Sequence, residues 1–418
     1  MMFLSPGSLP PIRLLVGPVM SITLMPGPTN NRIGGSEPGE RNIISGNSYG
    51  GVSLNGSNTG RNSIIGNYVG TDPSGALAVP NAGDGIVACV GAFNTLVQSN
   101  LSSGNDRYGV SFSDWGTNYN VAVGNRIGMD AAGTRVIPNR GSGVFLGYGG
   151  AQFNRVGGTH AEDRNLIIGG VEVTGQMARG NLVLGNWIGT DISGKQGLAA
   201  RGLGVQLGGD SHSIIGGATP QEANVIAGNG WVGVYVGPDY NYVAGNYIGT
   251  DPGGQSRMGS GTSGVAVLNG EHNIIQGNVI TATTKNGLPW PGWGSGINAN
   301  PGGSNTFRRN SVYGNEGKGI EYNPAPSGIG TSLVTAAPVI AVVGAAGVSG
   351  TACAGCEVEI FADSDDEGRS FEGSTVADVS GAFRFSKAGV LAGPNVTATA
   401  TDQQGNTSEF STPRAIGK

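Results

Sequence analysis

Charged side chains are scarce in this chain of 418 residues. Asp, Glu, Lys and Arg together make up 12% of it, about half the usual share. The net charge is −5, and no cluster of basic residues indicates nucleic-acid binding. No apolar run reaches the roughly 18 residues that a membrane-spanning helix needs. We therefore expect neither a nucleic-acid partner nor insertion into a membrane.

Histidine and cysteine are equally rare, with three residues of each. The histidines are far apart, and none is spaced from a cysteine or carboxylate as zinc ligands are. Cys353 and Cys356 form a C-x-x-C pair, but a second pair and the βαβ setting of a redox site are both missing. We expect a local disulfide between them, which leaves Cys89 alone.

The first 30 residues, MMFLSPGSLPPIRLLVGPVMSITLMPGPTN, are apolar but interrupted by prolines. They lack the basic start, the unbroken hydrophobic run and the cleavage site of a secretory signal peptide. The repeats described below are under way by Asn31. We interpret residues 1–30 as a lead-in or cap, and we expect the polypeptide to begin inside or just upstream of a longer natural array.

Glycine, by contrast, is abundant, with 79 residues, and it marks a short repeat. Gly followed by Val or Ile recurs ten times between Gly51 and Gly319, at intervals of 23 to 34 residues. The residue after each glycine and the residue two places further on are apolar, as in Val52 and Leu54. Two apolar columns separated by one mixed column predict a strand with one buried face.

A second phrase, N-x-I-x-G-N, follows many of these predicted strands. It occurs at 62–67, 181–186 and 273–278, with Ile64, Val183 and Ile275 at the position that we expect to be buried. The second asparagine suits a sharp corner, because its short amide tolerates a left-handed backbone. It can also bond to the backbone or to the equivalent amide of the neighbouring coil.

Short strands, glycine corners and like residues at each coil predict a β-solenoid. On the Gly-Val/Ile column and the N-x-I-x-G-N phrases, residues 31–330 resemble the right-handed parallel β-helix proteins of the pectin-lyase-like class. The resemblance implies an all-β chain of about ten coils. It leaves function open, since that fold hosts lyases, hydrolases, epimerases, adhesins and passive scaffolds. Two other repeat folds do not fit. Leucine-rich repeats would need helices, and propeller blades would be longer than the shortest interval between the Gly-Val/Ile positions.

A longer phrase, G-N-x-[VI]-G-x-D, recurs on alternate coils and carries Asp72, Asp130, Asp191 and Asp251. A catalytic residue is needed once, whereas a structural residue is needed at every repeat. Glycine three places after each aspartate favours an Asx turn in a loop that leads back to the next strand. Calcium binding and catalysis are the alternatives.

The repeat stops near Thr331, and residues 331–418 read as short alternating strands separated by glycine turns. We expect an Ig-like β-sandwich that caps the open end of the solenoid. GTACAGCEVEIFADSDDEG and TATATDQQGNTSEFS resemble the small C-terminal modules of bacterial secreted and surface proteins, which implies an extracellular or cell-surface location. Asp363, Asp365 and Glu367 form either a structural calcium loop or a solvated acidic hairpin.

The mixed strand column should face outward, and its middle reads Glu172, Gln206, Tyr235 on successive coils, with Arg201 nearby. In the polysaccharide lyases and hydrolases that share the resembled fold, the active groove often lies on such a face. If the chain is an enzyme, we expect Glu172 to be the general acid or base, Arg201 the charge stabiliser and Tyr235 the proton partner. Solvated polar residues on a sheet face are the alternative.

Aromatic residues are only 6% of the chain, and several gather between Trp231 and Trp293. Exposed aromatic faces bind sugars well, so Trp231, Tyr240, Trp290, Trp293 and Gln206 are candidate polysaccharide contacts. Local packing of the tryptophans is the alternative. We therefore expect a β-solenoid that binds an extracellular polysaccharide along its side. A polysaccharide lyase or glycoside hydrolase and a non-binding spacer are the other two hypotheses, and the oligomeric state stays open.

Overall fold

The computed structural model describes residues 15–16, 21–199, 202–209, 212–285, 292–324 and 334–417. The chain forms two compact units, Met1–Gly230 and Trp231–Lys418, and each is described by itself. Within the described ranges, helical structure is limited to two 3-10 turns, η1 (Pro38–Glu40) and η2 (Ala161–Asp163). No helix in those ranges is long and apolar enough to cross a membrane. The prediction of an all-β chain is confirmed.

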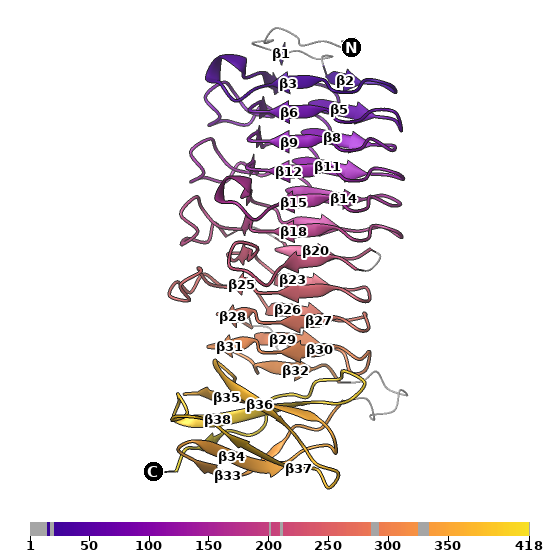
Figure 1. Ribbon diagram of the computed structural model, residues 1–418. Coiled ribbons are helices and arrows are strands. Elements are labelled where there is room, and N and C mark those ends of the chain that lie inside the picture. The colour runs from indigo at the N-terminus through magenta and orange to yellow at the C-terminus, as the bar shows by residue number, and fades with distance from the viewer. Residues whose placement is uncertain are drawn as a thin grey trace. The chain divides into compact units, whose positions relative to one another are not determined.

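Three parallel sheets make up the first unit, and each coil contributes one short strand to each sheet (Figure 1). Sheet 1 contains β2 (Ile22–Leu24), β5 (Val52–Asn55), β8 (Ile86–Cys89), β11 (Val110–Ser113), β14 (Val144–Gly147), β17 (Val171–Val173) and β20 (Val205–Leu207). Sheet 2 contains β3 (Arg32–Gly34), β6 (Ser63–Ile65), β9 (Leu96–Gln98), β12 (Val121–Val123), β15 (Arg155–Gly157), β18 (Leu182–Leu184) and β21 (Ile214–Gly216). Sheet 3 contains β1 (Leu15–Val16), β4 (Ile43–Ser45), β7 (Tyr68–Val69), β10 (Leu101–Ser102), β13 (Arg126–Ile127), β16 (Leu166–Ile167), β19 (Trp187–Ile188) and β22 (Val225–Ile226).

The second unit begins with the same arrangement of strands. Its sheet 1 contains β23 (Val232–Val236), β26 (Ser263–Val267), β29 (Ser295–Ala299) and β32 (Ile320–Tyr322). Its sheet 2 contains β24 (Tyr242–Ala244), β27 (Ile274–Gln276) and β30 (Thr306–Arg308), and its sheet 3 contains β25 (Tyr247–Ile248), β28 (Val279–Thr281) and β31 (Ser311–Tyr313). The strands within each sheet of this unit are again parallel.

The sheet-1 strands coincide with the predicted Gly-Val/Ile positions. Val52 and Leu54 point inward and are fully buried, and Val110 pairs in register with Val144 on the next coil. The inner residues of the N-x-I-x-G-N phrases, such as Ile64, are fully buried as well. Each coil thus closes around a column of branched aliphatic side chains, which a single coil could not bury alone.

Asparagine side chains connect the coils at their corners. At Asn125, Oδ1 accepts from the backbone N–H of Asn100 at 2.9 Å and from its Nδ2 at 3.1 Å. Asn125 in turn donates from Nδ2 to Oδ1 of Asn165 at 2.9 Å and to the carbonyl oxygen of Val97 at 2.9 Å. The same pattern runs through Asn42, Asn67, Asn100, Asn125, Asn165, Asn186 and Asn224 in the first unit, and through Asn246, Asn278 and Asn310 in the second. The predicted bonding between equivalent amides is confirmed.

Two further rows of asparagines follow the same rule. One includes Asn31 and Asn62, then Asn120, Asn154 and Asn181, then Asn241, Asn273 and Asn305. The other, which the sequence patterns did not predict, joins Asn47, Asn81, Asn105 and Asn139 where sheet 3 ends. All of these side chains are buried. A buried amide that lost its hydrogen-bond partners would lower the stability of the fold. The rows therefore fix the register between neighbouring coils.

The repeated aspartates hold tight hairpins by accepting backbone hydrogen bonds. Asp72 Oδ1 accepts from the backbone N–H groups of Ala76 and Leu77, both at 2.9 Å. Hydrogen bonds from Ser74 and then from Leu77 lower the pKa of Asp72 to about 2. Asp130, Asp191 and Asp251 accept equivalent bonds from the residues four or five places further on. The predicted Asx turns are confirmed.

The C-terminal module consists of two antiparallel sheets. One contains β33 (Val339–Gly344), β34 (Gly347–Thr351) and β37 (Ala382–Ser386), and the other contains β36 (Ser370–Val376), β35 (Glu357–Asp363), β38 (Asn395–Thr401) and β39 (Arg414–Ala415). Side chains from both sheets share one core, which includes Val348 and Phe383 on one side and Ile360 and Ala398 on the other. The module is therefore a small sandwich. The predicted Cys353–Cys356 disulfide is present.

Within the second unit, the module covers the last strands of the solenoid. Gly368 and Val312 exchange two backbone hydrogen bonds of 3.0 Å. The carboxylates of Glu359 and Glu367 are buried there and accept the backbone N–H groups of Arg309 and Asn315, at 2.8 Å and 3.3 Å. Strand edges that would otherwise be open are thus occupied, as expected from the sequence.

We predict that replacing Asn125 by Leu lowers the free energy of unfolding by about 2–4 kcal/mol, because it strands several buried polar groups. The urea midpoint of the full chain is the measurement. Asn58→Leu, at an exposed asparagine, is the matched control. A loss at Asn125 no larger than the loss at Asn58 would contradict the structural role of the amide rows.

We also predict that the module's contact weakens between about pH 4.5 and pH 7. Burial raises the pKa of Glu359 and of Glu367 from 4.5 to about 7, although the Arg309 and Asn315 N–H groups oppose it. A raised pKa in the folded state gives stability that is complete below the unfolded value and is lost as pH rises through the folded value. The urea midpoint should therefore fall from pH 5 to pH 8.

The matched variant is Glu359→Gln, which keeps the shape of the side chain in its uncharged form. The variant should lose part of this pH dependence. An identical pH profile for the variant and the parent chain would show that Glu359 does not titrate with the contact.

Candidate functional site

The outward column of sheet 1 has the predicted composition in the first unit. Phe145 on β14, Glu172 on β17 and Gln206 on β20 lie side by side in register. Glu172 and Gln206 are partly exposed, but Phe145 is buried even though it points away from the solenoid core. Something on the outer face therefore covers the Phe145 ring.

Two tyrosines provide this cover. The ring of Tyr108 stacks on Phe145 with 4.2 Å between centroids and 10° between planes. Tyr148 lies at 4.5 Å from Phe145 with a tilted ring, and the two tyrosine hydroxyls are 3.1 Å apart. Gly141 and Gly147 leave the space, because a Cβ at either position would meet the Tyr108 or the Phe145 ring within 3 Å. The aromatic cluster thus depends on small residues in two connecting segments.

A tryptophan extends the aromatic surface. Trp115 follows β11, and its indole lies over Gly149 and Gly150 on the next coil, adjacent to Tyr148. It is 63% exposed, and Tyr148 is 48% exposed. Large aromatic faces are therefore open to solvent on two neighbouring coils.

Polar groups border these rings. Arg107 donates from Nη2 to the Tyr148 hydroxyl at 3.0 Å, and its Nε is 3.7 Å from the Asp84 carboxylate. Burial raises the pKa of Asp84, against the effect of Arg107. Glu172 Oε2 accepts from the Ser142 hydroxyl at 2.6 Å.

Tyr108 lies between the polar groups on both sides of the rings and interacts with Tyr148 on one side and with the charge of Glu172 on the other. Burial raises the pKa of the Tyr108 phenol, with further contributions from its bond to Tyr148 and from the charge of Glu172. We name the set Arg107, Tyr108, Trp115, Phe145, Tyr148 and Glu172 the platform. Its rings offer apolar faces, and its polar atoms offer both hydrogen-bond donors and acceptors.

The remaining predicted sugar and catalytic residues lie elsewhere or outside the described residues. Arg201 and Trp290 are not among the described residues. In the second unit, Trp231 is 69% exposed, Tyr240 is 51% exposed and stacks on His272 at 4.9 Å, and Trp293 is half-buried. Tyr235 lies on the outer face of β23, in register with Ala266, and its hydroxyl accepts from Asn269 at 3.4 Å.

The acidic loop of the module does not gather its carboxylates. Asp363 accepts the backbone N–H groups of Asp365 and Arg369, while Glu367 turns toward Asn315 of the solenoid. Among the described residues, no three His, Cys, Asp or Glu side chains converge on a point that would suit a metal ion. A structural calcium at Asp363, Asp365 and Glu367 stays a prediction.

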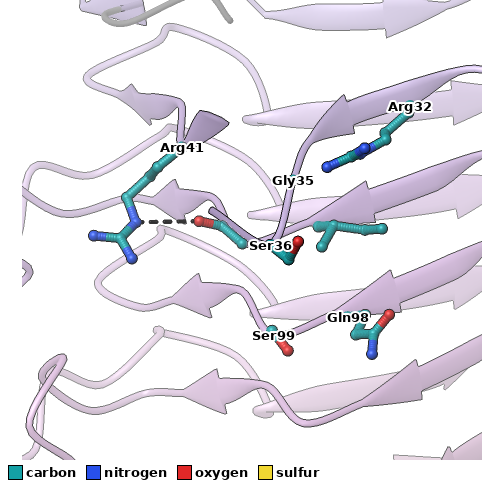
Figure 2. A pocket seen from close by; sticks show the side chains of 8 residues that line it. Arg32, Gly35, Ser36, Arg41, Gln98 and Ser99 are labelled. Atoms are coloured by element: carbon teal, nitrogen blue, oxygen red, sulfur yellow. Dashed lines mark hydrogen bonds between the residues drawn. The ribbon is translucent and has the colours of Figure 1, made fainter. Parts of the chain in front are cut away.

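A hollow of about 470 Å³ is a second candidate, and Figure 2 shows its lining. Arg41 donates from Nε to the carbonyl oxygen of Gly66 at 3.2 Å and stacks on Tyr68, while Arg32 pairs with Glu40 at 2.7 Å. The same brace recurs further along the chain, with Arg164 over Trp187 and Arg155 beside Asp163. Repetition on two coils marks the arrangement as structural.

The sequence patterns pointed to Glu172 and Gln206 but not to Arg107, Tyr108, Trp115 and Tyr148. These four side chains lie outside the strand columns, in connecting segments of variable length. One signal was present: Phe145 is a large apolar residue in a column that is otherwise mostly small or polar. A neighbouring aromatic residue is needed to cover such a side chain.

A family model agrees with this fold over part of the chain. A family model described as "Right handed beta helix region" matches residues 191–359. No curated protein matches the chain in sequence. The Dettilon tailspike protein aligns with 93% of this chain and 69% of its own, at 13% identity and a TM-score of 0.33. The enzymatically active domain of bacteriophage CBA120 tailspike protein 2 aligns with 95% of this chain and 72% of its own, at 9% identity and a TM-score of 0.29.

The chain is thus a right-handed parallel β-helix repeat protein with a C-terminal sandwich.

We predict that Cys89, at the end of β8 beside this face, reacts slowly with neutral alkylating reagents. Burial, followed by the charges of Asp114 and Asp84, raises the pKa of its thiol from 9.0 to about 11. Only the thiolate reacts, so alkylation by iodoacetamide at pH 8 should be roughly two orders of magnitude slower than for a free thiol. Asp114→Asn should accelerate it. If Cys89 is labelled as fast as the thiol of glutathione, and Asp114→Asn does not change the rate, the raised thiol pKa and the effect of the Asp114 charge would be contradicted.

Proposed function

We propose that the chain binds an extracellular polysaccharide, with the platform on sheet 1 of the first unit as a contact surface. The observation that carries the proposal is the pair of exposed aromatic faces, Trp115 and Tyr148, placed beside hydrogen-bonding groups. Large exposed aromatic side chains are costly to leave in water and commonly mark a binding surface.

The chemistry of the platform suits a sugar chain. The axial C–H groups of a pyranose pack on an aromatic ring, while its hydroxyls need donors and acceptors around the edge of that ring. Arg107 and the tyrosine hydroxyls supply donors, and Glu172 supplies acceptors. Gln206, next to Glu172 in register, extends the polar edge by one coil.

The second unit carries exposed aromatic residues of its own, which we propose as further sugar contacts. Trp231 and Tyr240 are both more than half exposed, and they stay proposed contacts. A polymer, rather than a small molecule, is the ligand that would use surfaces on several coils. We propose that the protein lies outside the cell or at its surface, which fits such binding and is what the resemblance of the C-terminal module implied.

Cleavage of the bound polymer is the second candidate function. Glu172 favours it, because its carboxylate is partly exposed on the platform and is positioned by the Ser142 hydroxyl. In that case Glu172 acts as the general acid or base, with Arg201 and Tyr235 in the roles assigned from the sequence.

We predict that Tyr148→Ala and Trp115→Ala each weaken polysaccharide binding at least tenfold, because each removes a stacking face. The measurement is affinity electrophoresis or calorimetry on a polysaccharide array, with reducing-end and unsaturated-product assays run in parallel. Tyr49→Ala, at an aromatic residue that is 70% exposed and outside the platform, is the control.

Three outcomes separate the hypotheses. Binding that survives both platform substitutions would move the site to Trp231 and Tyr240, where Trp231→Ala tests it. Turnover that is lost in Glu172→Gln would establish the enzyme. Absence of binding to every polymer would leave a structural spacer and end the proposal.

A further inference from the structure

We infer that the glycan held by the platform carries no charge, an inference that rests on the proposed function and names the class of its ligand. The reason is the balance of charges around the rings. Every cation found there among the described residues is paired with a carboxylate of the protein, and further carboxylates remain.

The first cation is Arg107. Its Nε lies 3.7 Å from the Asp84 carboxylate, and its Nη2 is occupied by the Tyr148 hydroxyl. Asp84 is nearly buried, so solvent screens this pair less than an exposed pair. Arg107 is therefore a poor partner for an acidic sugar, because binding a second carboxylate would compete with Asp84.

The second cation is Arg140, in the segment that packs on Tyr108 through Gly141. Arg140 Nε lies 3.3 Å from the Asp106 carboxylate. Both arginines next to the rings are thus paired within the protein.

Two more carboxylates border the same rings. Glu172 lies beside Phe145, and Asp114 directly precedes Trp115 and donates its backbone N–H to Gly147, next to Tyr148. Neither forms an ion pair with a cation among the described residues. Among the described residues, the two arginines and four aspartates or glutamates around the rings give a surplus of two negative charges, counted as four minus two.

This surplus decides between classes of polysaccharide. A polyuronate or a sulfated glycan would bring a negative group to every sugar or two, within the roughly 8–10 Å over which charges interact at moderate salt. Like charges at a binding surface oppose association. Hydroxyl groups of an uncharged sugar, by contrast, can donate hydrogen bonds to Glu172 and Asp114. When ionised, these two carboxylates can only accept hydrogen bonds.

The experiment uses the full chain and polymers that share a backbone and differ in charge. The pairs are hydroxyethylcellulose with carboxymethylcellulose, and methyl-esterified with de-esterified polygalacturonate. A third pair consists of uncharged chitin oligosaccharides and their deacetylated counterparts, which are cationic. For the backbone that binds, we expect the uncharged member to bind at least tenfold more tightly than the anionic member, with the difference shrinking as salt rises.

Variants locate the effect on the platform. Removing the surplus with Glu172→Gln and Asp114→Asn should raise the affinity for the anionic member at low salt at least threefold. Adding Asp84→Asn should raise it further, because Arg107 is then released. Glu162→Gln, at an exposed glutamate of η2 that forms no ion pair among the described residues, should leave it unchanged. Circular dichroism checks that each variant is folded.

The outcomes are distinct. Tighter binding of the anionic member, or no response to the three charge-removing substitutions, would overturn the uncharged class while the binding function stands. Tighter binding of the deacetylated chitin oligosaccharides would also overturn it, in favour of a cationic glycan. Absence of binding to all six probes would remove this inference together with the proposed function.

Discussion

The hydrogen bond between equivalent asparagine amides of neighbouring coils is the interaction on which the rest of the structure depends. Each amide, such as that of Asn125, satisfies backbone groups at a corner where the parallel sheets are interrupted. A corner without these bonds would bury unpaired N–H and carbonyl groups. Because each amide in a row bonds with its counterpart in the next coil, the rows also set the register of all three sheets. A one-residue slip would break the row and turn the buried aliphatic column outward.

The fixed register creates the surface on which function is proposed. An outward column of sheet 1 places Phe145 beside Glu172, and a phenylalanine there must be sheltered from water. Tyr108 and Tyr148 shelter it by stacking over its ring, and they remain partly exposed in doing so. The same rings thus complete the packing of the coil and present an amphipathic face to solvent. Packing and the proposed recognition depend on the same side chains, so substitutions at the platform need a stability measurement beside each binding measurement.

The parts of the fold that obey a short period could be predicted from sequence. The alternation of Val52 and Leu54 indicated sheet 1, and Asn62 to Asn67 indicated sheet 2 with its corners. Sheet 3 was missed, because a two-residue strand such as Tyr68–Val69 is too short to show alternation. On the site, the neighbouring positions of Glu172 and Gln206 followed from the repeat. Tyr108, Trp115 and Tyr148 did not, since they belong to connecting segments whose lengths vary and whose contacts arise only after the coils stack.

The hairpins held by the repeated aspartates touch each other across an intervening coil. Ala131 donates its backbone N–H to the carbonyl oxygen of Gly75, and Ile192 donates to Gly133, both at 2.9 Å. From Gly66 to Gly124 the spacing is 58 residues, and from there to Gly185 it is 61. The smallest complete repeating unit of this solenoid is therefore a pair of coils. Duplication or loss of one pair would preserve both the amide rows and the hairpin contacts, whereas an odd number of coils would place unlike loops against each other. Growth and shortening of such a chain, in evolution or by engineering, should proceed in steps of about sixty residues.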